Sequence, residues 1–569
     1  MARRVVWPAG LAVLVFLVSV GIRLTHLDLY STTDEGYWIQ RSLRFGAALA
    51  RGDLDSTFRA GHPGVTVMWA GLLGIGPGRL QPFLPERFAQ YNVLERAPGY
   101  LDAFSAARRA VAILASALIT VAVLLCWRLF GPGPALASGA LLTLDPYVIG
   151  MTRLLHVDAL LAPLMLVSVL AGLIVWTGAP RSRWPYLALS AVSGGLALLT
   201  KAPAALLPAY FGLVAIAAMS GAGRICWRRL WHTFLPLGVW GAVAAGVYVL
   251  LFPALWVNPV LRIQQLSDFV QAVGLQPHNG NFFLGRATLD DPGLLYYALA
   301  LPLRMSPLAA VGVGLLVLKA PAGNTATRWL LAYTLLFTLM MTLASKKFDR
   351  YMLPVLTALD VLAGVGLWRL VSLSLERWSA EQRVGRPVTP GWQPSSRQSP
   401  SLLAVALAGV LAAGQVVLLL RAWPYPVAYY NPLAGGPQRA RELIMVGWGE
   451  GLEQVADFLN SLPDADQSIV VSSYNHVLRP RFRGVTLPTA PYARGAAGLP
   501  MPDYMVLYVN TVQRQQISPE VQLAQAHGTL VFTAHVNGQE YAWVYQMPRT
   551  GPRPTAPVTI DESGEPEEN

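Results

Sequence analysis

Eleven apolar runs, most of them long enough to cross a membrane as a helix, divide this chain. A membrane-spanning helix needs roughly 20 mostly apolar residues. The runs lie at about 5–22, 105–127, 134–150, 159–177, 186–200, 203–219, 234–252, 294–318, 329–344, 351–370 and 401–420. They predict a mostly α-helical protein, a polytopic membrane bundle of about 11 spans in a lipid bilayer. The first run lacks a small-residue cleavage site before Arg23, so we expect an anchor rather than a signal peptide.

Composition supports the membrane class and excludes a nucleic-acid partner. Only 13% of the 569 residues are charged, against about 25% in soluble domains. The net charge of +12 could suggest nucleic-acid binding, but the arginines lie in short loops between apolar runs. The two cysteines, Cys126 and Cys226, show no metal-binding spacing, and we expect no disulfide between them.

Arginines orient the predicted bundle, because loops on the cytoplasmic side of membrane proteins are enriched in Lys and Arg. With the N-terminus inside, the inner loops hold most of the cations: Arg128, Arg181, Arg183, Arg224, Arg228, Arg229, Lys319, Arg328, Arg369, Arg377, Arg383, Arg386 and Arg397. The outer face then receives loops 23–104 and 253–293 and everything after about 421. The inner stretch 371–400 is rich in Pro and Ser, which predicts a flexible loop.

A soluble domain is predicted to follow the membrane domain of residues 1–420. Within 421–550, "GLEQVADFLNSL" has helical spacing, while "QSIVVSS" and "DYMVLYVN" are typical of strands. Asn537-Gly538 is a hairpin signal. We therefore expect a small extracytoplasmic α/β domain, followed by a disordered acidic tail at 551–569.

An acidic pair, Asp34 and Glu35, directly follows the first apolar run. It has a simple structural explanation, in which Thr33 or Asp34 is the N-cap of a helix "EGYWIQRSLRF". Other polar residues on the same predicted face of the membrane favour a functional explanation of the acidic pair. They are Tyr37 and His62 in the first outer loop, Asp145, Arg153, His156 and Asp158 in the next turn, Lys201, and His278 with Asn279.

Each of these residues also has a structural alternative. Arg153 and Asp158 can pair with each other, Lys201 can be a lone lysine at a membrane edge, and "QPHNGN" can be an ordinary polar turn. Ionisable residues at a membrane span are nevertheless functional hypotheses by default.

Three cations in "SKKFDR", namely Lys346, Lys347 and Arg350, lie on the outer face, where the positive-inside rule disfavours them. They indicate an anionic partner such as phosphate. Carboxylates can activate a hydroxyl or hold a metal, and cations can stabilise a departing phosphate. Together these residues suit group transfer from a phosphate-linked, membrane-borne donor to a hydroxyl or amine.

The order of these motifs resembles the GT-C membrane glycosyltransferases of the protein O-mannosyltransferase and lipid A aminoarabinose transferase superfamily. The similar segments are "DEGYW", "GHPGVTVMW", "TRLLHVDALLAP", "LLTKAP", "SKKFDRYMLP" and the region "YYNPLAGGPQRARELIMVGWGEGLEQVADFLN". Two departures favour a bacterial branch other than the aminoarabinose one. Gly61 and His62 stand where that branch has Glu-Lys, and no luminal sensor domain of the eukaryotic enzymes is evident.

The resemblance implies an inverting transferase of the cell envelope, a hexosyl- or pentosyltransferase. Its donor would be a polyprenyl-phosphate-linked sugar, and its acceptor a protein, lipid or glycan on the extracytoplasmic face. Asp34 would be the general base, with Glu35 and Asp158 the other catalytic acids. The donor phosphate would contact the cationic residues Lys201, Lys346, Lys347, Arg350 and Arg153, with or without a divalent cation (Mg²⁺ or Mn²⁺) at Asp34, Asp158 and His278. The acceptor or the cavity would use Tyr37, His62, His156, His278 and Asn279.

Two other function classes remain open. A transporter or lipid flippase would also carry charges within the membrane, but it should show paired halves with broken helices, and none are visible in the sequence. A non-catalytic scaffold would bind a partner through the outer domain and would tolerate replacement of Asp34 and Asp158.

Overall fold

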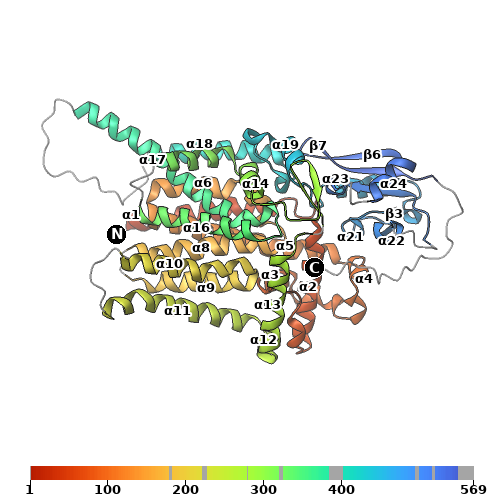
Figure 1. Cartoon of the computed structure of the whole chain (residues 1–569), viewed down its shortest axis with the longest axis horizontal. Helices are drawn as coiled ribbons and strands as arrows, with labels where there is room; N and C mark the ends of the chain where they lie inside the picture. Colours follow the sequence, from red (N-terminus) through yellow and green to blue (C-terminus); the bar gives the residue numbers. More distant parts are fainter. Residues whose placement is uncertain are drawn as a thin grey trace.

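The chain forms a helical bundle with a small α/β domain at one end (Figure 1). The computed structural model describes residues 2–178, 182–220, 227–278, 280–318, 324–383, 402–493, 499–514 and 519–548. Within them, eight helices are long and apolar enough to cross a membrane. They are α1 (Ala2–Leu24), α5 (Tyr100–Phe130), α8 (Val157–Thr177), α10 (Leu206–Ser220, after the 3-10 turn Ala202–Ala205), α11 (Trp227–Leu251), α16 (Thr325–Leu343), α17 (Leu353–Arg383) and α18 (Leu402–Ala422). Each coincides with a predicted run, so the predicted fold class is confirmed.

The three remaining runs are present but differ from simple spans. The run 186–200 is the shorter helix α9 (Trp184–Thr200). The run 134–150 is broken into α6 (Pro132–Leu144) and α7 (Pro146–Thr152), bent by 59°, and the run 294–318 into α14 (Tyr296–Arg304) and α15 (Pro307–Leu318), bent by 118°. Both second helices begin with a proline, whose missing N–H leaves no helical hydrogen bond unmade in the first turn.

The helix α8 is the centre of the bundle. It packs against α5, α9 and α17, and its residues from Val157 to Ile174 are buried. Asp158, in the first turn of α8, is therefore buried at one end of the bundle.

The two long outer loops are largely helical and lie at the same end as the C-terminal domain (Figure 1). The first contains α2 (Thr33–Ala50), α3 (Val65–Leu80), α4 (Tyr91–Glu95) and the 3-10 turns Asp55–Thr57, Gln81–Phe83 and Glu86–Ala89. The second contains α12 (Ala254–Val257), α13 (Pro259–Leu275), β1 (Asn281–Phe283) and β2 (Arg286–Thr288). The helix α13 runs across the bundle axis rather than along it.

The C-terminal domain has a mixed five-stranded sheet in the order β4-β3-β5-β7-β6. Its strands are β3 (Ile469–Val471), β4 (Val485–Leu487), β5 (Tyr504–Tyr508), β6 (Thr529–Val536) and β7 (Gln539–Gln546). Its helices are α19 (Gly436–Leu443), α20 (Leu452–Asn460), α21 (Asn475–Leu478), α22 (Thr489–Ala493), α23 (Val509–Gln513) and α24 (Pro519–His527), with 3-10 turns at Pro426–Ala428, Pro432–Ala434 and Ala465–Gln467. Asn537 and Gly538 have φ of 48° and 78°, so the predicted Asn-Gly hairpin is confirmed.

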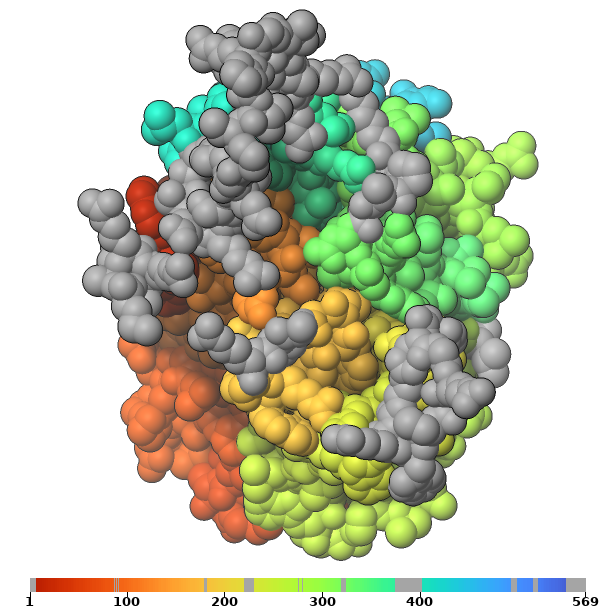
Figure 2. Space-filling model, turned by 90° about the vertical axis from the view of Figure 1, so that its left-hand side faces the viewer, coloured from red at the N-terminus to blue at the C-terminus, as the bar shows by residue number. Residues whose placement is uncertain are grey.

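The other end of the molecule is formed by the far ends of the spanning helices (Figure 2). One expectation about this end is wrong: residues 371–383, predicted as part of a loop, continue the helix α17. The rest of that loop, the acidic tail at 551–569 and Cys226 lie outside the described residues.

Candidate active site

A cavity of about 560 Å³ lies at the end of the bundle that carries the outer loops. Its walls come from α2, the segment before α3, the start of α8, the end of α9, α13 and the segment before α17. Its polar and aromatic lining consists of Asp34, Tyr37, Trp38, Arg41, Phe58, Arg59, His62, His156, Lys201, Phe269, His278, Lys346, Phe348, Arg350 and Tyr351. Residues from predicted motifs far apart in the sequence therefore meet in one space.

Asp34 faces this cavity from the first turn of α2, with 35% of its side-chain surface exposed. Its Oδ2 atom lies 3.3 Å from Nη2 of Arg350 and 3.4 Å from Nε2 of His156. Burial alone would raise the pKa of Asp34, but the hydrogen bond from His156 and the charge of Arg350 outweigh this and hold the pKa well below its usual value. The carboxylate is therefore ionised at neutral pH.

His156 links Asp34 to a second, buried carboxylate. Its Nδ1 atom accepts the backbone N–H of Asp158 at 3.2 Å, so the ring proton is on Nε2, which faces Asp34. The ring also meets Trp448 edge-on at 4.9 Å between centroids. The orientation of His156 is thus fixed from two sides.

Asp158 is 1% exposed and forms an ion pair with Lys201, with Oδ1 and Nζ 2.7 Å apart. Lys201 lines the cavity and lies 4.1 Å from the ring centroid of Tyr351. The alternatives of an Arg153–Asp158 pair and of a lone Lys201 are therefore wrong, because Lys201 is the partner that the structure brings to Asp158.

Glu35 points away from the cavity and is fully buried. It accepts hydrogen bonds from Nε of Arg108 at 2.6 Å, from the N–H of Leu155 at 2.7 Å and from the N–H of Thr32 at 3.0 Å. The N-cap of α2 is Thr32, not Thr33 or Asp34 as predicted, because Glu35 is then in the third helical position and completes a capping box.

The predicted phosphate-binding cations divide into two groups. Lys201, Lys346 and Arg350 line the cavity. Lys347 is instead buried against Asp291, with Nζ and Oδ1 2.5 Å apart. Arg153 does not line the cavity; it donates to the carbonyl of Thr25 and lies 5.4 Å from the ring centroid of Trp423.

The predicted acceptor residues Tyr37, His62, His156 and His278 all line the cavity, while Asn279 lies outside the described residues. Burial lowers the pKa of His62 well below its ordinary value and that of His278 to about 4. Both rings are therefore neutral at pH 7, and the cavity's positive charge comes from Lys and Arg.

Sequence reasoning missed two lining arginines, Arg41 and Arg59. The guanidinium of Arg41 stacks on Trp38 at 4.7 Å, and Nε of Arg59 is buried without a hydrogen-bond partner. Arg41 could have been found, because Asp34, Trp38 and Arg41 are spaced at i, i+4 and i+7 and so share one face of a helix.

The predicted metal ligands do not form a set. Among the residues that the structure describes, no group of three or more His, Cys, Asp or Glu is arranged to hold a metal ion. Asp158 is paired with Lys201, and Nδ1 of His278 lies 2.9 Å from the carbonyl of Gly280. The divalent cation that the resemblance allows therefore stays a prediction.

Residues 102–250, about a quarter of the chain, match the family model of dolichyl-phosphate-mannose-protein mannosyltransferases. The predicted resemblance to this superfamily is confirmed. The matched segment runs from the start of α5 to the end of α11 and includes His156, Asp158 and Lys201. No curated protein matches the chain.

Among the solved structures that match this chain, two cover nearly its whole length. ArnT from Cupriavidus metallidurans bound to undecaprenyl phosphate is 18% identical, with 95% of this chain and 97% of that chain covered and a TM-score of 0.47. The oligosaccharyltransferase from Archaeoglobus fulgidus is 13% identical, with 94% of this chain and 74% of that chain covered and a TM-score of 0.45.

Proposed function

We propose that the protein is an integral-membrane glycosyltransferase that moves a sugar from a polyprenyl-phosphate donor to an acceptor on the extracytoplasmic face. One observation carries this proposal: an ionised carboxylate, Asp34, shares a cavity with five cationic side chains at the end of a membrane bundle. The name of the matching family specifies a dolichyl-phosphate-linked mannose as donor and a protein as acceptor. We adopt the class of donor and leave the sugar and acceptor open.

In the proposed reaction Asp34 is the general base. The acceptor oxygen or nitrogen attacks the anomeric carbon and passes its proton to Asp34, while the bond between that carbon and the phosphate oxygen breaks and its electrons stay on the phosphate. A single displacement from the opposite side inverts the configuration at carbon. Because the pKa of Asp34 is low, the proton moves late, once the attacking group has begun to bond and become acidic.

The leaving phosphate requires charge neutralisation more than a proton donor. The cavity has five lining residues with a positive charge and one lining carboxylate, so its balance favours an anion. Those cations are Arg41, Arg59, Lys201, Lys346 and Arg350. Because the cavity is at the end of the membrane helices, a donor can leave its lipid tail in the bilayer and extend its head into the cavity.

The proposed transferase function can be tested by mass spectrometry of membrane lipids from cells with and without the gene. We expect a polyprenyl-phosphate sugar to accumulate in cells that lack the protein, together with a glycan, lipid or protein that lacks one sugar residue. Re-expression of the wild-type protein should reverse both changes. Unchanged lipids and glycans would contradict the transferase. Accumulation of a lipid on the inner leaflet alone, with no free donor outside, would favour the flippase.

A further inference from the structure

The segment "VGWGEG", residues 446–451, lies between the sheet of the C-terminal domain and the start of α2. Gly447, Gly449 and Gly451 have φ of 87°, 122° and 90°, a backbone region that favours glycine. The N–H of Gly449 donates to the hydroxyl of Tyr508 in β5 at 2.9 Å, and that hydroxyl donates to the carbonyl of Glu450 at 2.8 Å. The segment is therefore held in one shape by the sheet of the C-terminal domain.

This segment packs on the start of α2, the helix that carries Asp34. The N–H of Thr33 donates to the carbonyl of Trp448 at 3.0 Å. A Cβ atom on Gly449 would lie 2.5 Å from the carbonyl oxygen of Ser31, so the two backbones are in direct contact. The position of Asp34 thus depends on the position of residues 446–451.

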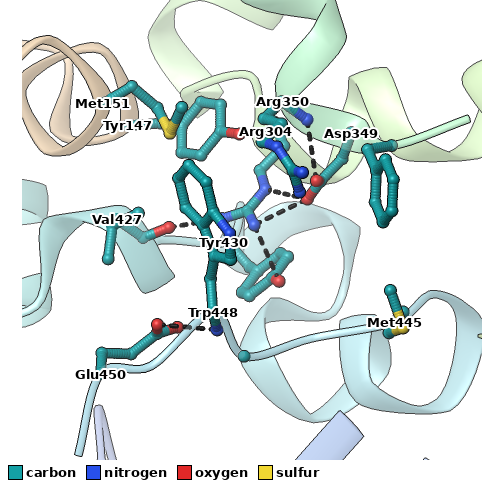
Figure 3. Close-up of a pocket in the computed structure, with 12 residues that line it drawn as sticks. Tyr147, Met151, Arg304, Asp349, Arg350, Val427, Tyr430, Met445, Trp448 and Glu450 are labelled. Atoms are coloured by element: carbon teal, nitrogen blue, oxygen red, sulfur yellow. Dashed lines mark hydrogen bonds and ion pairs between the residues drawn. The ribbon is translucent and has the colours of Figure 1, made fainter. Parts of the chain in front are cut away.

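The side chain of Trp448 contacts both groups that face Asp34. The guanidinium carbon of Arg350 lies 4.5 Å from the Trp448 ring centroid, and the ring of His156 lies 4.9 Å from it. Trp448 does not line the cavity of about 560 Å³, so it stands behind these groups and not against a substrate. It lines a smaller cavity of about 40 Å³, which Arg350 also lines (Figure 3).

Hydrogen bonds of Arg304 link the residues around this small cavity (Figure 3). Its guanidinium bonds to Oδ2 of Asp349 at 2.7 Å and to the carbonyls of Val427 and Tyr429 at 3.0 and 2.6 Å. Asp349 in turn accepts the backbone N–H of Arg350 at 2.8 Å. Arg304 thus fixes the backbone of Arg350 relative to the chain that leads into the C-terminal domain.

We propose that Trp448 is a positioning residue for the transfer reaction, and that the C-terminal domain, through residues 446–451, is part of the active site. The inference rests on the proposed function, with Asp34 as base. Trp448 acts through Arg350 and His156: by packing against both side chains it keeps them at contact distance from Asp34. A displacement of about 1 Å in such groups can reduce turnover by about 10²-fold.

The test compares Trp448→Leu and Trp448→Phe with a matched control, Trp543→Leu. Trp543 is another tryptophan of the same domain that stacks on an arginine, with Arg441 5.5 Å from its ring centroid. We expect Trp448→Leu to lower kcat by about 10- to 10²-fold with little change in the KM of the donor. Phenylalanine keeps an aromatic face for Arg350, so it should restore most of the activity, and Trp543→Leu should resemble the wild type.

Thermal unfolding and an experimental structure of Trp448→Leu complete the test. In that structure we expect Arg350 and His156 to have moved away from Asp34. Wild-type kcat in Trp448→Leu, or equal losses of kcat and Tm in Trp448→Leu and Trp543→Leu, would overturn the inference. A structure of Trp448→Leu in which Arg350 and His156 keep their contacts with Asp34 would also overturn the inference. Absence of transfer by the wild-type protein would instead overturn the proposed function. The structural result can be read in either case.

Discussion

At the scale of single residues, the first turn of α2 separates two adjacent carboxylates. Asp34 faces a polar cavity, while Glu35 is buried against Arg108 and caps the helix. Neighbouring residues on a helix point in different directions, so the sequence could predict that only one of the pair would face the cavity. It could not show which, because the choice depends on Arg108 and Leu155, which are distant in sequence.

The ion pair of Asp158 and Lys201 gives the first prediction. Lys201→Met leaves a buried carboxylate without its partner, which should lower the free energy of unfolding by about 3–5 kcal/mol. The double variant Lys201→Met/Asp158→Asn should regain much of this stability. We expect its turnover to stay low, because Lys201 lines the cavity as well. Thermal unfolding and turnover of the wild type, Lys201→Met, Asp158→Asn and the double variant form the complete cycle. Additive losses of stability would contradict the pairing.

Glu450 gives a prediction about pH. Burial is the main cause that raises the pKa of its carboxyl to about 7, from 4.5. Between pH 4.5 and 7 the folded protein therefore holds a proton that the unfolded chain loses, and stability falls as pH rises. The full effect corresponds to about 3 kcal/mol at pH 8. Glu450→Gln should be more stable than the wild type at pH 8 and equal to it at pH 4.5. A difference in Tm that does not change with pH would refute this assignment.

At the scale of elements, continuous apolar runs predicted every span but not where two of them break. The runs 134–150 and 294–318 each keep the length and average hydropathy of one span across Pro146 and Pro307, so hydropathy alone cannot show the bends. Asp145-Pro146 is a local cap signal, since the Asp145 side chain accepts the N–H of Val148 at 2.9 Å. The orientation of Lys347 and Arg153 was not predictable either, because their partners Asp291 and Thr25 are far away in sequence.

Residues 446–451 give a prediction for an element. Gly449→Ala adds a Cβ 2.5 Å from the carbonyl of Ser31, in addition to the strain of φ at 122°. Gly538→Ala is the matched control, since Gly538 has φ of 78° but nothing within 4 Å of the added atom. Strain alone costs about 1–2 kcal/mol in each variant. We expect Gly449→Ala to lower turnover by about 10-fold or more, because it moves the start of α2, and Gly538→Ala to keep it. Equal turnover in the two variants would exclude this coupling.

At the scale of the whole molecule, the fold brings both long outer loops and the C-terminal domain to one end of the bundle (Figure 1). The positive-inside rule assigns this end to the outside. We expect an introduced cysteine at Gln525, an exposed position in α24, to react with an impermeant reagent in intact cells. A cysteine at Thr325, exposed at the opposite end, should react only after the membrane is opened. Both belong in a Cys226→Ser background, and the reverse pattern would invert the topology.

The most direct test of the account uses the donor lipid that accumulates in cells without the gene. Purified wild-type protein, Asp34→Asn and Glu35→Gln, each in lipid vesicles, are mixed with this donor and an extract that contains the acceptor, and released polyprenyl phosphate is measured by mass spectrometry. We predict release by the wild type and a rate about 10²–10⁴-fold lower for Asp34→Asn, with donor binding retained. Glu35→Gln should lose stability and keep its activity per folded molecule. No release by the wild type, or a near-normal rate for Asp34→Asn, would contradict the account.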